Sequence, residues 1–170
     1  GAPVWRLLGG AARVPAEGME LADSKGEAFT LEGLAAGDTA WRDYTLSFEV
    51  RQTSCGNDWR DGVWAAVRCT PAPNMYVVGF YPGKVWLNKI VIGVSASDNK
   101  PLAEAGLPAP GLSDGKWHQV SISAVANRIG VAFDGAPLFE AEDSNPEHFA
   151  PLRAGAIMLG ARRSSLSASP

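Results

Sequence analysis

The chain has 170 residues, 46% of them hydrophobic and 19% charged, with a formal net charge of −3. This length suits one domain with a full core, and the single basic pair Arg162-Arg163 is too little for a nucleic-acid surface. No apolar run approaches the ~18 residues of a membrane span, so no membrane insertion is expected. We therefore predict one globular domain over residues 1–163 and a frayed tail over residues 164–170.

The chain begins Gly1-Ala2-Pro3 without an initiator methionine. Such a start is compatible with a processed protein or with a domain cut from a longer polypeptide. We expect a secreted or cell-surface location, extracellular or periplasmic, with other domains of a larger polypeptide as partners.

Period-two alternation recurs along the chain and predicts half-buried strands. In residues 44–51, for example, Leu46 and Phe48 point to one side while Ser47 and Glu49 point to the other. In chain order we expect strands over residues 4–14, 18–31, 44–51, 63–70, 75–81, 84–94, 118–124, 128–133, 137–141 and 156–159, with a surface loop over residues 102–113. Glycine and proline punctuate them at turns such as Pro82-Gly83 and Asp134-Gly135. About ten short strands without a convincing helix predict an all-β fold, a sandwich or a barrel.

Two cysteines, Cys55 and Cys69, leave the redox state open. A hairpin turning at Asp61-Gly62 would place them opposite each other, whereas a wide loop before Asp61 would hold them too far apart for a disulfide. We favour the wide loop. The two cysteines and the two histidines lack the short paired spacings of a zinc site.

Several motifs in one order resemble the concanavalin A-like jelly rolls, in particular the laminin-G-like and levan-binding-module-like domains. The series runs Trp41-Arg42-Asp43-Tyr44, Gly115-Lys116-Trp117-His118-Gln119-Val120, Asn127-Arg128-Ile129, Asp134-Gly135 and Gly155-Ala156-Ile157-Met158-Leu159-Gly160. It covers residues 41–160 and is more specific for the fold than for a function. The resemblance implies a two-sheet antiparallel jelly-roll sandwich, a glycan ligand bound on a sheet or at its loop edge, and a further last strand that the sequence lacks.

Six tryptophans fall into two groups. Trp5, Trp41 and Trp117 precede strands at positions where the family packs them inside, so we expect them in the core. Trp64 and Trp86 alternate with core positions and should face away from the sandwich interior. An outward indole is costly to expose unless something covers it or binds it.

The outward tryptophans suggest a sugar-binding face. Indoles stack on sugar C–H faces, while carboxylate, guanidinium and amide groups bind hydroxyls. The expected ligand-binding residues are Trp64, Trp86, Arg68, Glu49, Arg51, Asn88, Trp59 and Asp58. The alternatives are that a loop or a neighbouring domain covers the two indoles, or that the face binds a protein.

Catalysis is less favoured by the sequence. The glucanases of this superfamily carry Glu-x-Asp-x-x-Glu on one strand, and the acidic cluster Glu140, Glu142, Asp143 and Glu147 does not match that spacing. We predict a non-catalytic carbohydrate-binding module appended to a secreted polysaccharide-degrading enzyme, with a hydrolase or lyase and an adhesion domain as alternatives. No cofactor is required, and Asp23 and Asp143 are weak candidates for a structural calcium site.

Overall fold

In the computed structural model the described residues are 6–7, 11–13, 19–22, 33–55, 61–72, 74–91, 101–144, 149–162 and 164–169. They form fourteen strands and no helix, as the alternation predicted. No helix that could cross a membrane is found among them.

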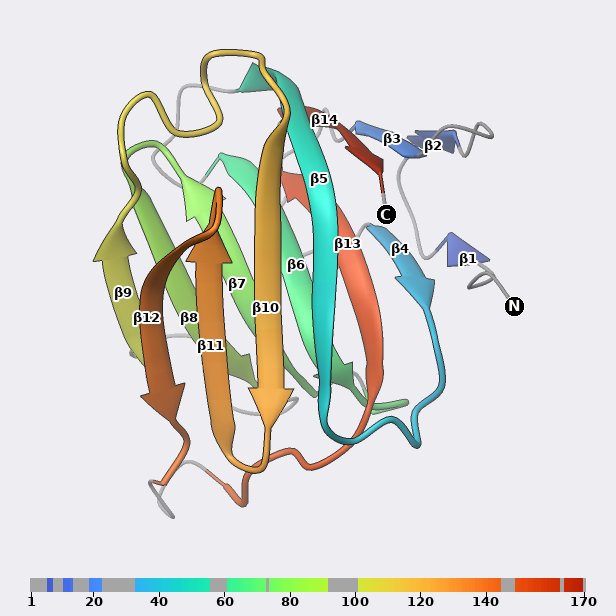
Figure 1. Cartoon of the computed structure of the whole chain (residues 1–170). Helices are drawn as coiled ribbons and strands as arrows, with labels where there is room; N and C mark the ends of the chain where they lie inside the picture. The colour runs from blue at the N-terminus through green and yellow to red at the C-terminus, as the bar shows by residue number, and fades with distance from the viewer. Residues whose placement is uncertain are drawn as a thin grey trace.

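The strands form two seven-stranded sheets packed face to face (Figure 1). The front sheet in that view has the order β12 (Ala136–Glu142), β11 (Arg128–Phe133), β10 (His118–Val125), β5 (Tyr44–Cys55), β14 (Ser164–Ser169), β3 (Met19–Ala22) and β2 (Ala11–Arg13). The back sheet has the order β1 (Arg6–Leu7), β4 (Gly33–Ala36), β13 (Ala156–Arg162), β6 (Gly62–Cys69), β7 (Met75–Tyr81), β8 (Lys84–Ile90) and β9 (Ala103–Gly106). All pairings between neighbouring strands are antiparallel.

One main core lies between the sheets because alternate residues of a strand point to opposite faces. In the front sheet Phe48 and Ile122 are buried, and in the back sheet Val78 and Leu87 face them in the same cluster. On β5, Thr45, Ser47 and Glu49 alternate with the buried residues and are exposed, as the sequence predicted.

The turns that join neighbouring strands have the backbone that their residues favour. Asp134 and Gly135 have φ of 49° and 77° between β11 and β12, as a type I′ hairpin turn requires. Gly83, with φ of 75°, follows Pro82 between β7 and β8, the arrangement of a type II turn.

Two sequence expectations about irregular segments are wrong. Residues 164–169 form β14, which pairs with β5 on one side and β3 on the other, so they are not a frayed tail and they supply the strand that seemed to be missing. The expected loop over residues 102–113 contains β9, paired with β8, and Leu107 and Leu112 are buried in the core. β14 covers an edge of β5 and β9 covers an edge of β8, and this pairing satisfies backbone groups that the side-chain pattern does not report.

Residues 149–155 run without regular structure across the lower end of the sandwich and lead into β13 (Figure 1). Interior side chains bind the backbone of this basal segment. Lys89 Nζ donates to the carbonyls of Phe149 and Ala150 at 2.9 and 3.0 Å, and Arg68 donates to the carbonyl of Leu152 at 2.6 Å. Buried cations therefore satisfy backbone groups that no strand pairs.

Candidate functional site

The structure distributes the expected ligand-binding residues over both faces of the molecule. Trp64 and Trp86 do face away from the main core, on the outer side of the back sheet, and Asn88 follows Trp86 on the same side of β8. Glu49 and Arg51 lie on the outer side of the front sheet, because β5 and β6 belong to different sheets although they are consecutive. The expectation of one shared face is wrong. Trp59, Asp58, Trp5 and Asp23 lie outside the described residues.

Trp64 and Trp86 belong to one row across the back sheet. Both pair in register with Gly79 of β7, and the ring of Tyr81 occupies the space over that glycine. Trp64 packs on a second buried cluster, and Trp86 has Lys84 Nζ 4.0 Å from its ring centre and the Tyr81 ring at 5.4 Å. Both indoles are half-buried, and their neighbours already cover part of their surface.

The side chain of Arg68 points into the protein and not toward an outer face where a ligand could bind. Its side chain is fully buried and bonds to the carbonyls of Ala126 and Leu152 and to the Asp43 carboxylate at 3.2 Å. Its φ of 54° interrupts the alternation of β6, so that Val67 and Arg68 both point inward. Burial lowers its pKa, which the charges of Tyr76, Asp43 and Tyr44 partly offset.

The upper end of the front sheet carries four outward groups that we call the Trp117 clamp: Glu49, Arg51, Trp117 and Gln119. Glu49 and Gln119 are direct cross-strand partners, and the Arg51 guanidinium lies 5.1 Å from the Trp117 ring centre. Trp117 is 45% exposed, so its expected burial in the core is wrong. Its alternation with buried His118 could have indicated this, because the two neighbours cannot both point inward.

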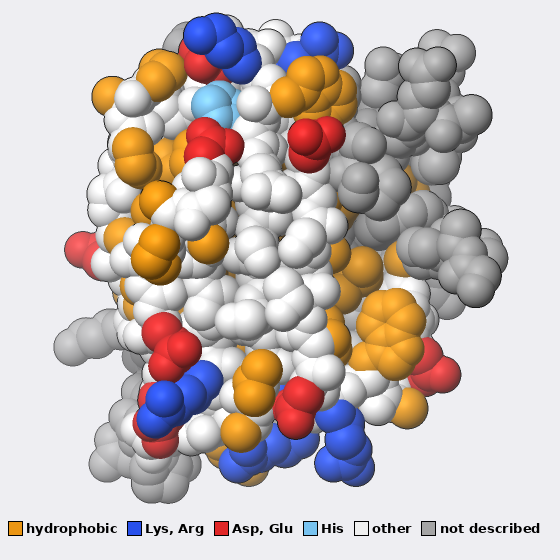
Figure 2. All heavy atoms as spheres, in the orientation of Figure 1, with side chains coloured by type: hydrophobic (Ala, Val, Ile, Leu, Met, Phe, Trp, Pro, Cys, Tyr) orange, Lys and Arg blue, Asp and Glu red, His pale blue; other side chains and the backbone are white. Residues whose placement is uncertain are grey.

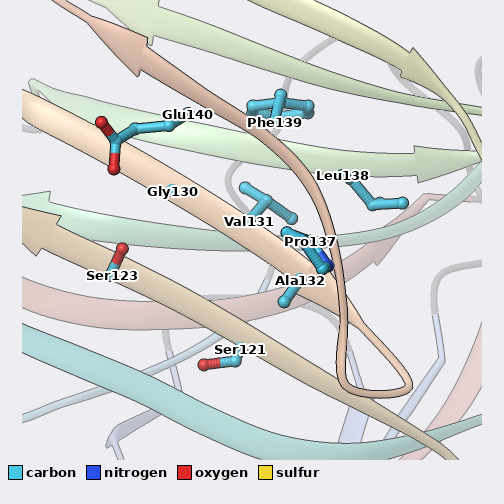
Figure 3. A pocket seen from close by; sticks show the side chains of 9 residues that line it. All are labelled: Ser121, Ser123, Gly130, Val131, Ala132, Pro137, Leu138, Phe139 and Glu140. Carbon is cyan, nitrogen blue, oxygen red and sulfur yellow. The ribbon is translucent and has the colours of Figure 1, made fainter.

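A shallow depression of about 350 Å³ lies on the same face, over β10, β11 and β12 (Figure 3). We call it the serine trough, lined by Ser121, Ser123, Gly130, Val131, Ala132, Pro137, Leu138, Phe139 and Glu140. Gly130 forms its floor, because a Cβ there would lie 2.6 Å from the Ser123 hydroxyl. In Figure 3 that hydroxyl and the Glu140 carboxylate lie on the two sides of Gly130.

The trough continues onto β5. Ser47 and Ser121 are cross-strand partners with hydroxyls 3.3 Å apart, and Thr45 pairs with Ser123 in the next row. Figure 2 shows the result: over β10 and β5 the middle of the face has few charged or hydrophobic side chains, and charges gather at its upper and lower ends. The face is an uncharged, hydroxyl-bearing strip between charged ends.

The buried side chain of His118 lies between two clamp residues in the chain, Trp117 and Gln119. Its ring lies between two carboxylates, with Nδ1 2.8 Å from Asp134 and Nε2 2.9 Å from Asp114, and it stacks on Phe133. Two carboxylates accept from both nitrogens only if the imidazole is protonated. Burial lowers the pKa of His118, but the hydrogen bonds and charges of Asp134 and Asp114 outweigh it and raise the pKa above its usual value.

Stability should therefore fall on the alkaline side. A raised pKa in the folded state means that the stabilisation from His118 is complete below the unfolded pKa of about 6.5 and is lost as pH rises through the folded pKa. We expect the melting temperature to drop as the pH rises above about 6.5, and His118→Gln to flatten that drop. Thermal unfolding followed by circular dichroism measures it, and an equal drop in the variant would contradict the assignment.

Asp143, the other calcium candidate, is buried and forms an ion pair with Lys89. Its Oδ2 accepts from Lys89 Nζ at 2.7 Å and from the Tyr76 hydroxyl at 2.5 Å. Within the described ranges no group of three or more His, Cys, Asp or Glu side chains could hold a metal ion. The ammonium of Lys89 gives Asp143 the positive partner that a cation would give, and calcium binding remains an untested prediction.

The cysteines are free, with Cys55 exposed and Cys69 buried. β5 ends at Cys55 and β6 begins at Gly62 in the other sheet, which agrees with the favoured wide loop. Burial raises the pKa of the Cys69 thiol to about 12, so this thiol stays neutral.

No protein-family model and no curated protein matches the chain. Among solved structures, a carbohydrate binding module, CBM66 from Bacillus subtilis, is similar over 97% of this chain and 91% of that one, with a TM-score of 0.74 and 16% identity. A Bacillus subtilis protein of unknown function with a galectin-like fold covers 97% of this chain and 86% of its own, with a TM-score of 0.61 and 12% identity. The catalytic domain of a laminarinase from Thermotoga petrophila has a TM-score of 0.54 at 10% identity and covers 81% of this chain and 58% of its own. These similarities show that the fold is the concanavalin A-like jelly roll that the sequence motifs implied.

Proposed function

We propose that this chain is a non-catalytic carbohydrate-binding module of a secreted polysaccharide-degrading enzyme, and that it binds glycan on the outer face of the front sheet. The single observation that carries the proposal is the Trp117 clamp, which joins a 45% exposed indole to a guanidinium, a carboxylate and an amide at the end of a hydroxyl-lined strip. The similarity to a carbohydrate binding module supports it.

The chemistry of the clamp suits a neutral sugar. An indole offers a flat apolar face to sugar C–H groups, while Glu49 accepts and Arg51 donates hydrogen bonds to hydroxyls. The small side chains of the serine trough leave room for a ring beside them. A preformed, shallow site of this kind binds with micromolar to millimolar strength, about −4 to −8 kcal/mol.

The positions of the acidic side chains favour binding over hydrolysis. Glu49 lies on β5 and Glu140 on β12, three strand spacings or about 14 Å apart, and they are also offset along the strands. Glycosidases hold their two carboxylates about 5–10 Å apart. Glu140 and Glu142 instead form ion pairs with Arg128 at 3.2 and 3.6 Å.

Replacing Trp117 with alanine should abolish retention on a polysaccharide. Losing a central aromatic anchor costs ~2 kcal/mol or more, so we expect affinity to fall at least tenfold. Affinity electrophoresis in gels that contain laminarin, levan or a galactan measures retention of the wild type and the variant.

Trp86→Ala is the matched control on the opposite face. It should keep wild-type retention, whereas loss in Trp86→Ala with retention in Trp117→Ala would move the site to the back sheet. Reducing ends released from the same polysaccharides would favour a hydrolase, and retention by none of them would favour a protein-binding domain.

A further inference from the structure

A second hollow lies at the other end of β5. This Trp41 groove, of about 380 Å³, is lined by Trp41, Arg42, Asp43, Tyr44, Thr45, Leu46 and Ile157. It opens beside the first half of β5, because β14 pairs only with the stretch from Glu49 to Cys55. Along residues 44–48 of β5, β10 is the only pairing partner among the described strands.

The Trp41 indole presents a flat aromatic surface in this groove, which we call the shelf. The indole of Trp41 lies directly on Gly37, where a Cβ would approach ring carbons to 2.3 Å, and it packs edge-on against the Tyr44 ring with 5.9 Å between the ring centres. Its backbone is held by bonds to Asp38 and Gly155. The side chain is nevertheless 42% exposed, so the expectation that it packs in the core is wrong. An aromatic ring that is fixed but open loses little entropy on binding.

Polar groups surround the shelf. Asp43 Oδ1 is held by the Ala126 amide at 2.9 Å and by Arg68, while the Asp43 side chain stays 60% exposed. Arg42 and the Thr45 hydroxyl are exposed beside it. The groove therefore combines a carboxylate fixed in direction, a guanidinium and a hydroxyl around one indole.

We infer that the Trp41 groove is a second sugar-binding subsite, which takes a distant unit of the same neutral glycan chain that the Trp117 clamp holds. This inference rests on the proposed function. Thr45 lines the groove and pairs with Ser123 of the serine trough, so the two hollows adjoin. Six residues of β5, about 20 Å, separate Thr45 from Arg51, which fits an extended internal stretch of a polysaccharide.

The test compares fragments of increasing length. Calorimetric titration of the wild type with levan and laminarin fragments should show affinity that rises once a fragment spans both subsites. Trp41→Ala should remove that rise and weaken the longest fragment about tenfold, with the shortest fragment within about twofold of wild type. Arg42→Ser should weaken long fragments about threefold in the same way.

Controls separate folding from binding. Arg42 is exposed, so its variant should keep the wild-type melting temperature even if Trp41→Ala does not. Phe149→Ala removes another exposed aromatic of the lower end, outside the groove, and should bind as wild type.

The outcomes are distinguishable. Wild-type length dependence in both Trp41→Ala and Arg42→Ser would overturn the second subsite while leaving the clamp intact, and would favour an extended peptide pairing with the edge of β5. A wild type that binds no fragment of any length would overturn the proposed function and this inference together.

Discussion

Arg68→Met should lower the free energy of unfolding by about 2–4 kcal/mol, the cost of leaving the hydrogen-bond acceptors of Arg68 without a donor. The guanidinium is fully buried and binds the carbonyls of Ala126 and Leu152 and the Asp43 carboxylate. Methionine fills a similar volume but donates no hydrogen bond, so the carbonyls of Ala126 and Leu152 lose the donor that Arg68 supplies. Chemical denaturation monitored by tryptophan fluorescence measures the loss.

Arg128→Met is the matched control. Arg128 also bonds to carboxylates, Glu140 and Glu142, but it lies on the surface with 58% of its side chain exposed. Exposed ion pairs contribute about 0–1 kcal/mol, so this variant should unfold nearly as the wild type does. Equal effects of the two substitutions would show that Arg68 does not hold the basal segment.

Asp143→Ala should be similarly destabilising, by about 3–5 kcal/mol, because it leaves the ammonium of Lys89 buried without its counter-charge. Asp143 and Lys89 have side chains only 1% and 5% exposed, and their atoms are 2.7 Å apart. The Tyr76 hydroxyl loses its acceptor at the same time. We expect a melting temperature lower by about 10 °C, measured by differential scanning calorimetry.

The double variant Lys89→Met, Asp143→Leu distinguishes a buried charge from simple loss of packing. It removes both charges together, so it should recover part of the stability that Asp143→Ala loses. A double variant less stable than Asp143→Ala would show that the bonds of Lys89 to Phe149 and Ala150 matter more than its pairing with Asp143.

The networks around Arg68 and around Asp143 explain why the sequence did not indicate that these two charged residues are buried. Arg68 sits at an outward position of an alternating strand, and Asp143 follows a run of acidic residues at a strand end. Both patterns are typical of exposed side chains. Arg68 is buried where the basal segment, distant from it in sequence, brings a carbonyl that accepts its hydrogen bond. Asp143 is buried because Lys89 and Tyr76, distant from it in sequence, donate to its carboxylate.

By itself the sequence determined the local features: the alternating strands, the Pro82-Gly83 and Asp134-Gly135 turns, the all-β class, and the outward direction of Trp64 and Trp86. These follow from side-chain periodicity and backbone preference, which act over a few neighbouring residues. The strand pattern left a sandwich or a barrel open, and the family resemblance favoured the sandwich.

Only the tertiary structure decided which strands share a sheet, and therefore which side chains share a face. Glu49 and Arg51 lie on the face opposite Trp64 rather than beside it, and Arg51 lies over the Trp117 ring instead. Which strands pair depends on backbone hydrogen bonds between distant segments, and the pattern of side chains along one strand says little about them. For the same reason the pairing of β14, the inward turn of Arg68 and the exposure of Trp41 became visible only in the folded chain.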